Sequence, residues 1–183
     1  MPDQLPSPIG PDRDATAVRT ETDGLLVDLR SDDGMRRKRA RAALVELGRP
    51  VVARLLELVD GVNDRERAEA AMALGEIGDP HSATRLVEAL EDRDFGIRWS
   101  AAAGLAHIGR PALPPLLSAL TRKQDSEWLR EGAHHVLKDM RVQGLSAEVQ
   151  EVLAALEGSG PNTEVLTAAV AALRSIRAEA PSA

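Results

Sequence analysis

The sequence contains no cysteine and very few aromatic residues. The absence of cysteine excludes disulfide scaffolds, thiolate zinc sites and cysteine nucleophiles. Two Trp, one Phe and no Tyr occur among 183 residues, so Ala, Leu, Val and Ile must fill the core. A core of small aliphatic side chains favours closely packed helices over a β-sandwich.

Long apolar runs and an excess of positive charge are also missing. No apolar stretch approaches the roughly 18 residues of a membrane-spanning helix, so we expect no membrane span. The first residues lack a basic start and an apolar stretch, so we expect no secretory signal and predict a soluble cytoplasmic protein. The formal net charge of -6 argues against nucleic acid as the partner.

Both ends of the chain differ in composition from the middle. Residues 1–20 carry several prolines among Asp, Ser and Gly, with no apolar period. Residues 179–183 are similar. We predict disordered tails at 1–20 and 179–183, and one repeat region over residues 21–178.

A pattern of about thirty residues recurs between the tails, as in repeat architectures. Each copy has Arg, Ala three residues later, Leu four after that, and Leu, Ile or Met three after that. The copies start at Arg37, Arg67, Arg98 and Arg130. These spacings place the apolar residues on one stripe of a helix. Gly follows directly in three copies and is suited to end the helix, whereas the fourth copy has Arg141 there.

A second helix is predicted after each of these helices. Pro follows the terminal Gly by two residues in three copies and fits the first turn of the next helix. Apolar boxes for the second helices occur at 55–59, 86–90, 116–120 and 152–156. Residues 25–29 look like a second helix without a first, and residues 162–178 like a first helix without a second. We therefore predict four helix pairs with a half-repeat at each end.

The second and third copies resemble a known repeat family. Residues 64–80 read DRERAEAAMALGEIGDP, and residues 94–109 read DFGIRWSAAAGLAHIG. Both resemble the short HEAT-like repeats first associated with phycobilisome lyases. The resemblance implies an all-α, right-handed α-solenoid of stacked helix pairs. It says little about function, because such repeats serve lyases, hydroxylases, regulators and scaffolds alike.

The repeated arginine allows two interpretations. It could form a cationic row for an acidic partner, or a structural ladder. The ladder members are Arg37, Arg67, Arg98 and Arg130. Because the residue recurs at one helical position in every pair, we favour the ladder, with partners at the next repeat's start such as Asp64 or Asp94. For the dense basic run at 36–39 with Arg41, we favour a solvated face over docking of an acidic protein or nucleic acid.

Trp99 is the strongest candidate for partner binding. At about 100° per residue it lies about 160° from Ala101 of the core stripe, so it points outward. An exposed Trp is a typical interface anchor. Phe95 and Trp128 fit either the same patch or packing between neighbouring first helices.

Outward residues of the second helices give a second candidate surface. Second helices usually line the concave side of such an array, and their outward positions carry mixed charge. These positions are Arg54, Glu57, Arg85, Glu88, Pro115, Ser118, Glu151 and Ala154. A strip of this kind suits a helix or an extended peptide, although it could serve solubility alone. The partner-binding residues we predict are Trp99, Arg54, Glu57, Arg85 and Glu88.

Catalytic and metal chemistry find little support. Glu131, His135 and Asp139 share one helix face, but an outward-facing set lacks the second wall of a metal site. There is no glycine-rich phosphate loop and no obvious nucleophile–base pair. We expect no catalytic residue, no cofactor and no metal.

These observations favour a non-enzymatic protein–protein interaction module, a scaffold or regulatory adaptor with a curved helical surface. The alternative is a bilin-lyase-like protein, or another cofactor-maturation factor, that acts with a partner subunit. The identity of the protein partner and the oligomeric state are not predicted.

Overall fold

The computed structural model describes residues 15–141 and 144–179, which form ten α-helices and three short 3-10 helices and contain no strand. The α-helices are α1 (Ala15–Asp28), α2 (Gly34–Leu47), α3 (Val52–Val59), α4 (Asp64–Ile77), α5 (Ala83–Ala89), α6 (Phe95–Ile108), α7 (Leu113–Arg122), α8 (Glu127–Met140), α9 (Ala147–Glu157) and α10 (Asn162–Glu179). The 3-10 helices are η1 (Arg49–Val51), η2 (Pro80–Ser82) and η3 (Arg110–Ala112).

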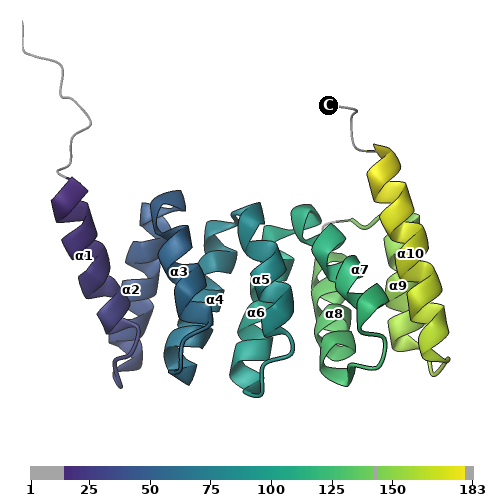
Figure 1. Ribbon diagram of the computed structural model, residues 1–183, viewed down its shortest axis with the longest axis horizontal. Helices are drawn as coiled ribbons and strands as arrows, with labels where there is room; N and C mark the ends of the chain where they lie inside the picture. Colours follow the sequence, from purple (N-terminus) through teal and green to yellow (C-terminus); the bar gives the residue numbers. More distant parts are fainter. Residues whose placement is uncertain (1–14, 142–143, 180–183) are drawn as a thin grey trace, which may run out of the picture.

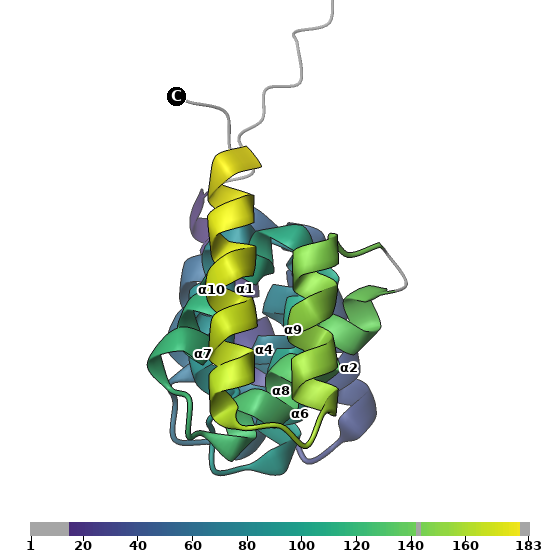
Figure 2. The same ribbon diagram turned by 90° about the vertical axis from the view of Figure 1, so that its right-hand side faces the viewer.

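The helices stack in two layers, seen side on in Figure 1 and end on in Figure 2. The first-helix layer contains α2, α4, α6 and α8, each packed against the next. The second-helix layer contains α1, α3, α5 and α7, and α3 and α5 also pack against the first helices that follow them. The predicted all-α solenoid is confirmed.

The repeated Ala and Leu form the core between neighbouring helices. The four alanines of the pattern are at most 2% exposed and the four leucines are fully buried. They are Ala40, Ala70, Ala101 and Ala133, with Leu44, Leu74, Leu105 and Leu137. Each buried Leu contributes about 1.5–3 kcal/mol relative to an exposed one. The small Ala lets helices approach closely at its level, and Leu fills the space beside it.

Polar caps and glycines fix where the first helices begin and end. Asp33, Asn63, Asp94 and Ser126 each accept a backbone N–H of the first turn through a side-chain oxygen. Gly78 ends α4 in the left-handed region with φ of 71°, where a β-carbon would be strained. Pro80 then opens η2 without the loss of a helical hydrogen bond. This turn delivers the chain to the second-helix layer.

The last two helices lie in the opposite layers from those we expected. The box at 152–156 was predicted to lie with the second helices, and residues 162–178 with the first helices. Instead α9 packs against α8 and α10 packs against α7, as Figure 2 shows. Arg141 has ordinary helical backbone angles and replaces the glycine that ends the earlier first helices. Without the Gly-x-Pro turn, the chain continues in the first-helix layer and crosses only after α9.

The first helix begins earlier in the chain than we predicted. Helix α1 begins at Ala15, so residues 15–20, which we assigned to a tail, are helical. Residues 1–14 and 180–183 lie outside the described residues, and the boundaries of the repeat region remain predictions. Among the described helices, none is long and apolar enough to cross a membrane.

Candidate functional site

All three aromatic side chains of the protein lie in one exposed group on α6 and α8, here called the aromatic cluster. Phe95 is 60% exposed, Trp99 53% and Trp128 45%. The ring centroids of Phe95 and Trp99 are 6.3 Å apart. The rings therefore gather on the outer face of the first-helix layer and stay accessible.

Arg98 connects the rings of neighbouring repeats. Its guanidinium carbon lies 4.6 Å from the ring centroid of Trp128 and 5.6 Å from that of Phe95. The same guanidinium donates a hydrogen bond of 2.8 Å to the carbonyl oxygen of Asp92. A cation–π contact at an exposed site contributes about 0.5–1 kcal/mol. Arg98 thus ties Trp128 on α8 to the loop that precedes α6.

His135 supports Trp99 from the neighbouring helix. The two ring centroids are 4.2 Å apart with a tilt of 38°, and Nε2 of His135 lies 3.7 Å from Asp139. The rings border a depression of about 180 Å³, whose wall includes Ala102 and Gly132. A volume of this size admits a side chain, since a water molecule occupies only about 30 Å³ in the liquid.

The predicted charges of the second helices form a regular set of ion pairs. The predicted residues are Arg54, Glu57, Arg85 and Glu88. Each arginine pairs with the glutamate three residues later and with an aspartate nearer the N-terminus, Asp23 for Arg54 and Asp60 for Arg85. Exposed pairs of this kind contribute about 0–1 kcal/mol each.

Trp99 and these four charges lie in different layers. Trp99 belongs to α6, whereas the charged residues belong to α3 and α5 of the second-helix layer (Figure 1). Glu151 and Ala154, which we expected to continue the charged strip, lie on α9 beside α8. The predicted partner-binding residues are therefore divided between two surfaces.

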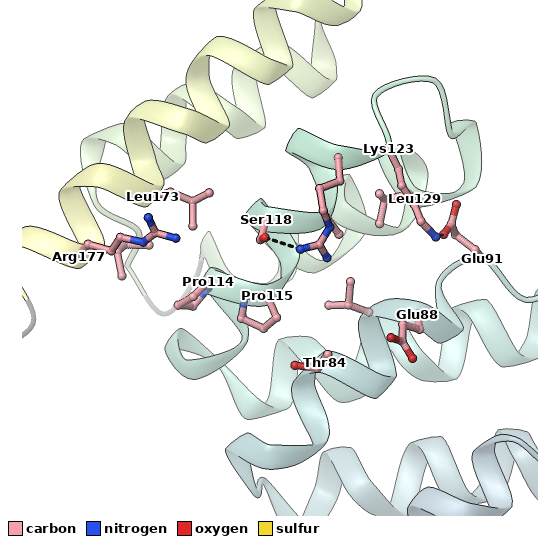
Figure 3. Close-up of a pocket in the computed structure, with 14 residues that line it drawn as sticks. Thr84, Glu88, Glu91, Pro114, Pro115, Ser118, Lys123, Leu129, Leu173 and Arg177 are labelled. Atoms are coloured by element: carbon pink, nitrogen blue, oxygen red, sulfur yellow. Dashed lines mark hydrogen bonds and ion pairs between the residues drawn. The ribbon is translucent and has the colours of Figure 1, made fainter.

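A groove of about 560 Å³ lies on the second-helix layer between α5, α7 and α10, and we call it the second-layer groove (Figure 3). Its lining residues include the predicted Glu88, Pro115 and Ser118. Its other wall comes from Leu173, Ile176 and Arg177 of α10. We did not predict this wall, because we expected residues 162–178 to lie among the first helices.

Glu91 at the edge of the groove is held as a carboxylate. Burial acts to raise the pKa of its carboxyl, but hydrogen bonds with Lys123 and Ser126 and the charge of Lys123 outweigh that effect and lower the pKa. The negative charge of Glu91 is therefore balanced by Lys123 within the protein.

Comparison with known families agrees with this architecture. The sequence model for HEAT repeats matches residues 22–98, 52–138 and 85–174, which together cover most of the chain. The chain belongs to the HEAT-repeat family. The match does not distinguish the phycobilisome lyase type within the family. HEAT repeats generally act as protein-interaction scaffolds. No curated protein matches this HEAT-repeat chain.

Within these HEAT repeats, the recurring arginine binds the loop before its helix and reaches the next repeat. Arg67 donates to the carbonyl oxygen of Gly61 at 3.1 Å, and its Nη2 lies 2.8 Å from Asp64 and 3.2 Å from Asp92. Arg67 is only 8% exposed, so its charge requires these partners. The partner of Arg67 in the following repeat is therefore Asp92, and not Asp94 as we expected.

The other recurring arginines reach different groups in the next repeat. Arg37 pairs with Glu69 at 3.1 Å, and not with the expected Asp64. Arg98 stacks on Trp128, and Arg130 donates to Asn162 at the start of α10. The contacts place Arg98 in the aromatic cluster as well as in the ladder.

Part of the basic run at 36–39 with Arg41 is neutralised by carboxylates. Arg36 lies 2.6 Å from Asp28, and a hydrogen bond and the charge of that carboxylate raise the pKa of Arg36. Arg41 pairs with Glu69 at 2.5 Å. The run is thus built partly into contacts between α1, α2 and α4.

The histidines do not gather with carboxylates into a larger set. In the described part of the chain, no three His, Cys, Asp or Glu side chains are arranged to hold a metal ion. His135, for which we weighed a metal role, instead stacks on Trp99.

Proposed function

We propose that this HEAT-repeat protein is a non-enzymatic protein-interaction module, a scaffold or adaptor, and that the aromatic cluster is its main contact surface. The observation that carries this proposal is the exposure of all three aromatic side chains in one group on α6 and α8. Trp is enriched among the residues that dominate binding energy at protein interfaces. Large rings left in water have an unfavourable hydration cost that a partner would remove.

The packing of the cluster supports a binding role. The largest fully buried side chains are Leu and Ile, so the core does not depend on the aromatic rings. Arg98 and His135 hold the rings of Trp128 and Trp99 on rigid helices. Side chains ordered before binding lose less conformational entropy in a complex.

Affinity capture from the native cell tests this function. The bait proteins are the full-length chain and its variants Trp99→Ala and Trp128→Ala, with partners quantified by mass spectrometry. Met35→Ala is the matched control, because Met35 is an apolar side chain of the first-helix layer with 57% exposure. We expect the Trp variants to stay folded, with melting temperatures within about 4 °C of the wild type. They should lose partners because affinity is at least about fivefold weaker, whereas Met35→Ala should retain them.

The opposite result is equally clear. Partner recovery that is the same for the wild type and both Trp variants would remove the aromatic cluster from the function. A change in tetrapyrrole absorbance on mixing with the purified protein would instead favour a cofactor-maturation role.

A further inference from the structure

The second-layer groove is lined by more basic than acidic side chains, although the whole chain is acidic. The chain carries a net charge of -6, yet the groove is lined by Arg122, Lys123 and Arg177 against Glu88 and Glu91. At physiological ionic strength, exposed charges more than about 8 Å apart are largely screened. Recognition at the groove therefore depends on its own lining more than on the total charge.

Both carboxylates of the groove are already neutralised within the protein. Glu88 pairs with Arg85, and Glu91 pairs with Lys123. Neither Arg122 nor Arg177 has a carboxylate partner among the described residues. Arg122 donates a hydrogen bond of 2.9 Å to the hydroxyl oxygen of Ser118, drawn in Figure 3. Two guanidinium groups are thus left to face an incoming anion.

Apolar side chains lie between these cations. Leu173 and Ile176 of α10 face Pro115 of α7 across the groove, and each is only partly buried. Figure 3 shows Arg177 and Leu173 extending from α10 toward α7. An apolar floor with cations at its edges matches a ligand that carries apolar side chains between carboxylates.

We propose that the second-layer groove binds an acidic, leucine-bearing peptide segment of a partner protein. Its carboxylates pair with Arg122 and Arg177, and its leucine side chains lie on Pro115, Leu173 and Ile176. The inference rests on the proposed interaction function but uses a surface in the other layer from the aromatic cluster. The two sites give the protein separate contacts for two segments.

Fluorescence anisotropy with labelled peptides tests the groove. The probe consists of repeats of Glu-Leu-Leu-Glu and is titrated with the full-length chain. Repeats of Lys-Leu-Leu-Lys and Glu-Ser-Ser-Glu test the need for carboxylates and for apolar side chains. We expect binding of the first peptide only, with affinity that falls as salt is raised.

Charge-reversal variants locate the binding. Arg122→Glu and Arg177→Glu should each weaken binding at least about fivefold. Arg39→Glu makes the same charge change on an exposed position of α2, outside the groove lining and in the other layer, and should change binding less than about twofold. Circular dichroism confirms that each variant remains folded.

Three outcomes would overturn the inference. They are no binding of the Glu-Leu-Leu-Glu peptide, equal loss in Arg39→Glu, or loss in Trp99→Ala with none in Arg177→Glu. Failure here with partner loss in the Trp variants leaves the aromatic cluster in place and removes only the groove. If the peptide binds the groove and the Trp variants still capture their partners, the groove is retained and the aromatic cluster is removed.

Discussion

Gly75 of α4 and Gly104 of α6 meet where two first helices pack against each other. A β-carbon built on Gly75 would lie 2.2 Å from Cα of Gly104, which is closer than such atoms can approach. A β-carbon on Gly104 would lie 3.1 Å from the carbonyl oxygen of Ala71. The close contact between the second and third HEAT repeats therefore requires glycine at position 75, whereas a β-carbon at position 104 would need its neighbours to shift by a few tenths of an ångström.

Substitution of Gly75 by Ala should destabilise the protein by about 1–3 kcal/mol, because the helices must separate to make room. Gly24→Ala is the matched control, since Gly24 lies in α1 and nothing would contact its β-carbon within 4 Å. This control should be stabilising by about 0.5–1 kcal/mol, the usual gain of Ala over Gly in a helix. Urea denaturation measures both values, and destabilisation by Gly24→Ala would contradict this reasoning.

Loss of the Arg67 guanidinium should be costly. Arg67→Met removes the hydrogen bond to the carbonyl oxygen of Gly61 and the pairs with Asp64 and Asp92 from a largely buried site. We expect a loss of about 2–3 kcal/mol. Arg65→Met removes an exposed pair with Asp32 and should cost less than about 1 kcal/mol. Equal effects in thermal denaturation would refute the ladder as a stabilising feature.

Acid should weaken the fold partly through Asp79. Hydrogen bonds with the backbone N–H and ring of His81, with the charge of Arg49 nearby, lower the pKa of Asp79 from its ordinary 3.8. Because the folded-state pKa is the lower one, the charged carboxylate stabilises the fold above pH 3.8, and that contribution is lost as pH falls through the folded-state pKa. Asp79→Asn should therefore be less stable than wild type near neutral pH and approach it in acid. A stability difference that is constant with pH would contradict this assignment.

The four-copy pattern predicted the solenoid because each copy carries its own helix stripe, and three of the four carry their own glycine stop signal. Arg67, Ala70, Leu74 and Gly78 encode α4 without reference to the rest of the chain. Our predicted layers for α9 and α10 were wrong, because the apolar face of each helix fits either layer. Their positions depend on the connection after Arg141 and on the surface of α7 that remains to be covered. Such information lies in the assembled array and not in local periodicity.

In the candidate site, too, some features could be predicted from local periodicity and others depend on the assembled array. The outward direction of Trp99 follows from helical periodicity, and its exposure in the structure agrees with it. The stacking of Arg98 on Trp128 depends on how far one repeat is rotated against the next, which the sequence does not state. The second-layer groove needs α10 beside α7, so it could not be predicted from a chain read in repeat order.

Site-specific photo-crosslinking tests whether the aromatic cluster contacts a partner protein in the cell. A photoreactive phenylalanine placed at position 99 or at position 35 would be irradiated in the native cell, and the adducts identified by mass. We predict a protein adduct at position 99 and none of comparable yield at position 35. Adducts at position 35 alone, or co-purifying partners with no adduct at position 99, would contradict it.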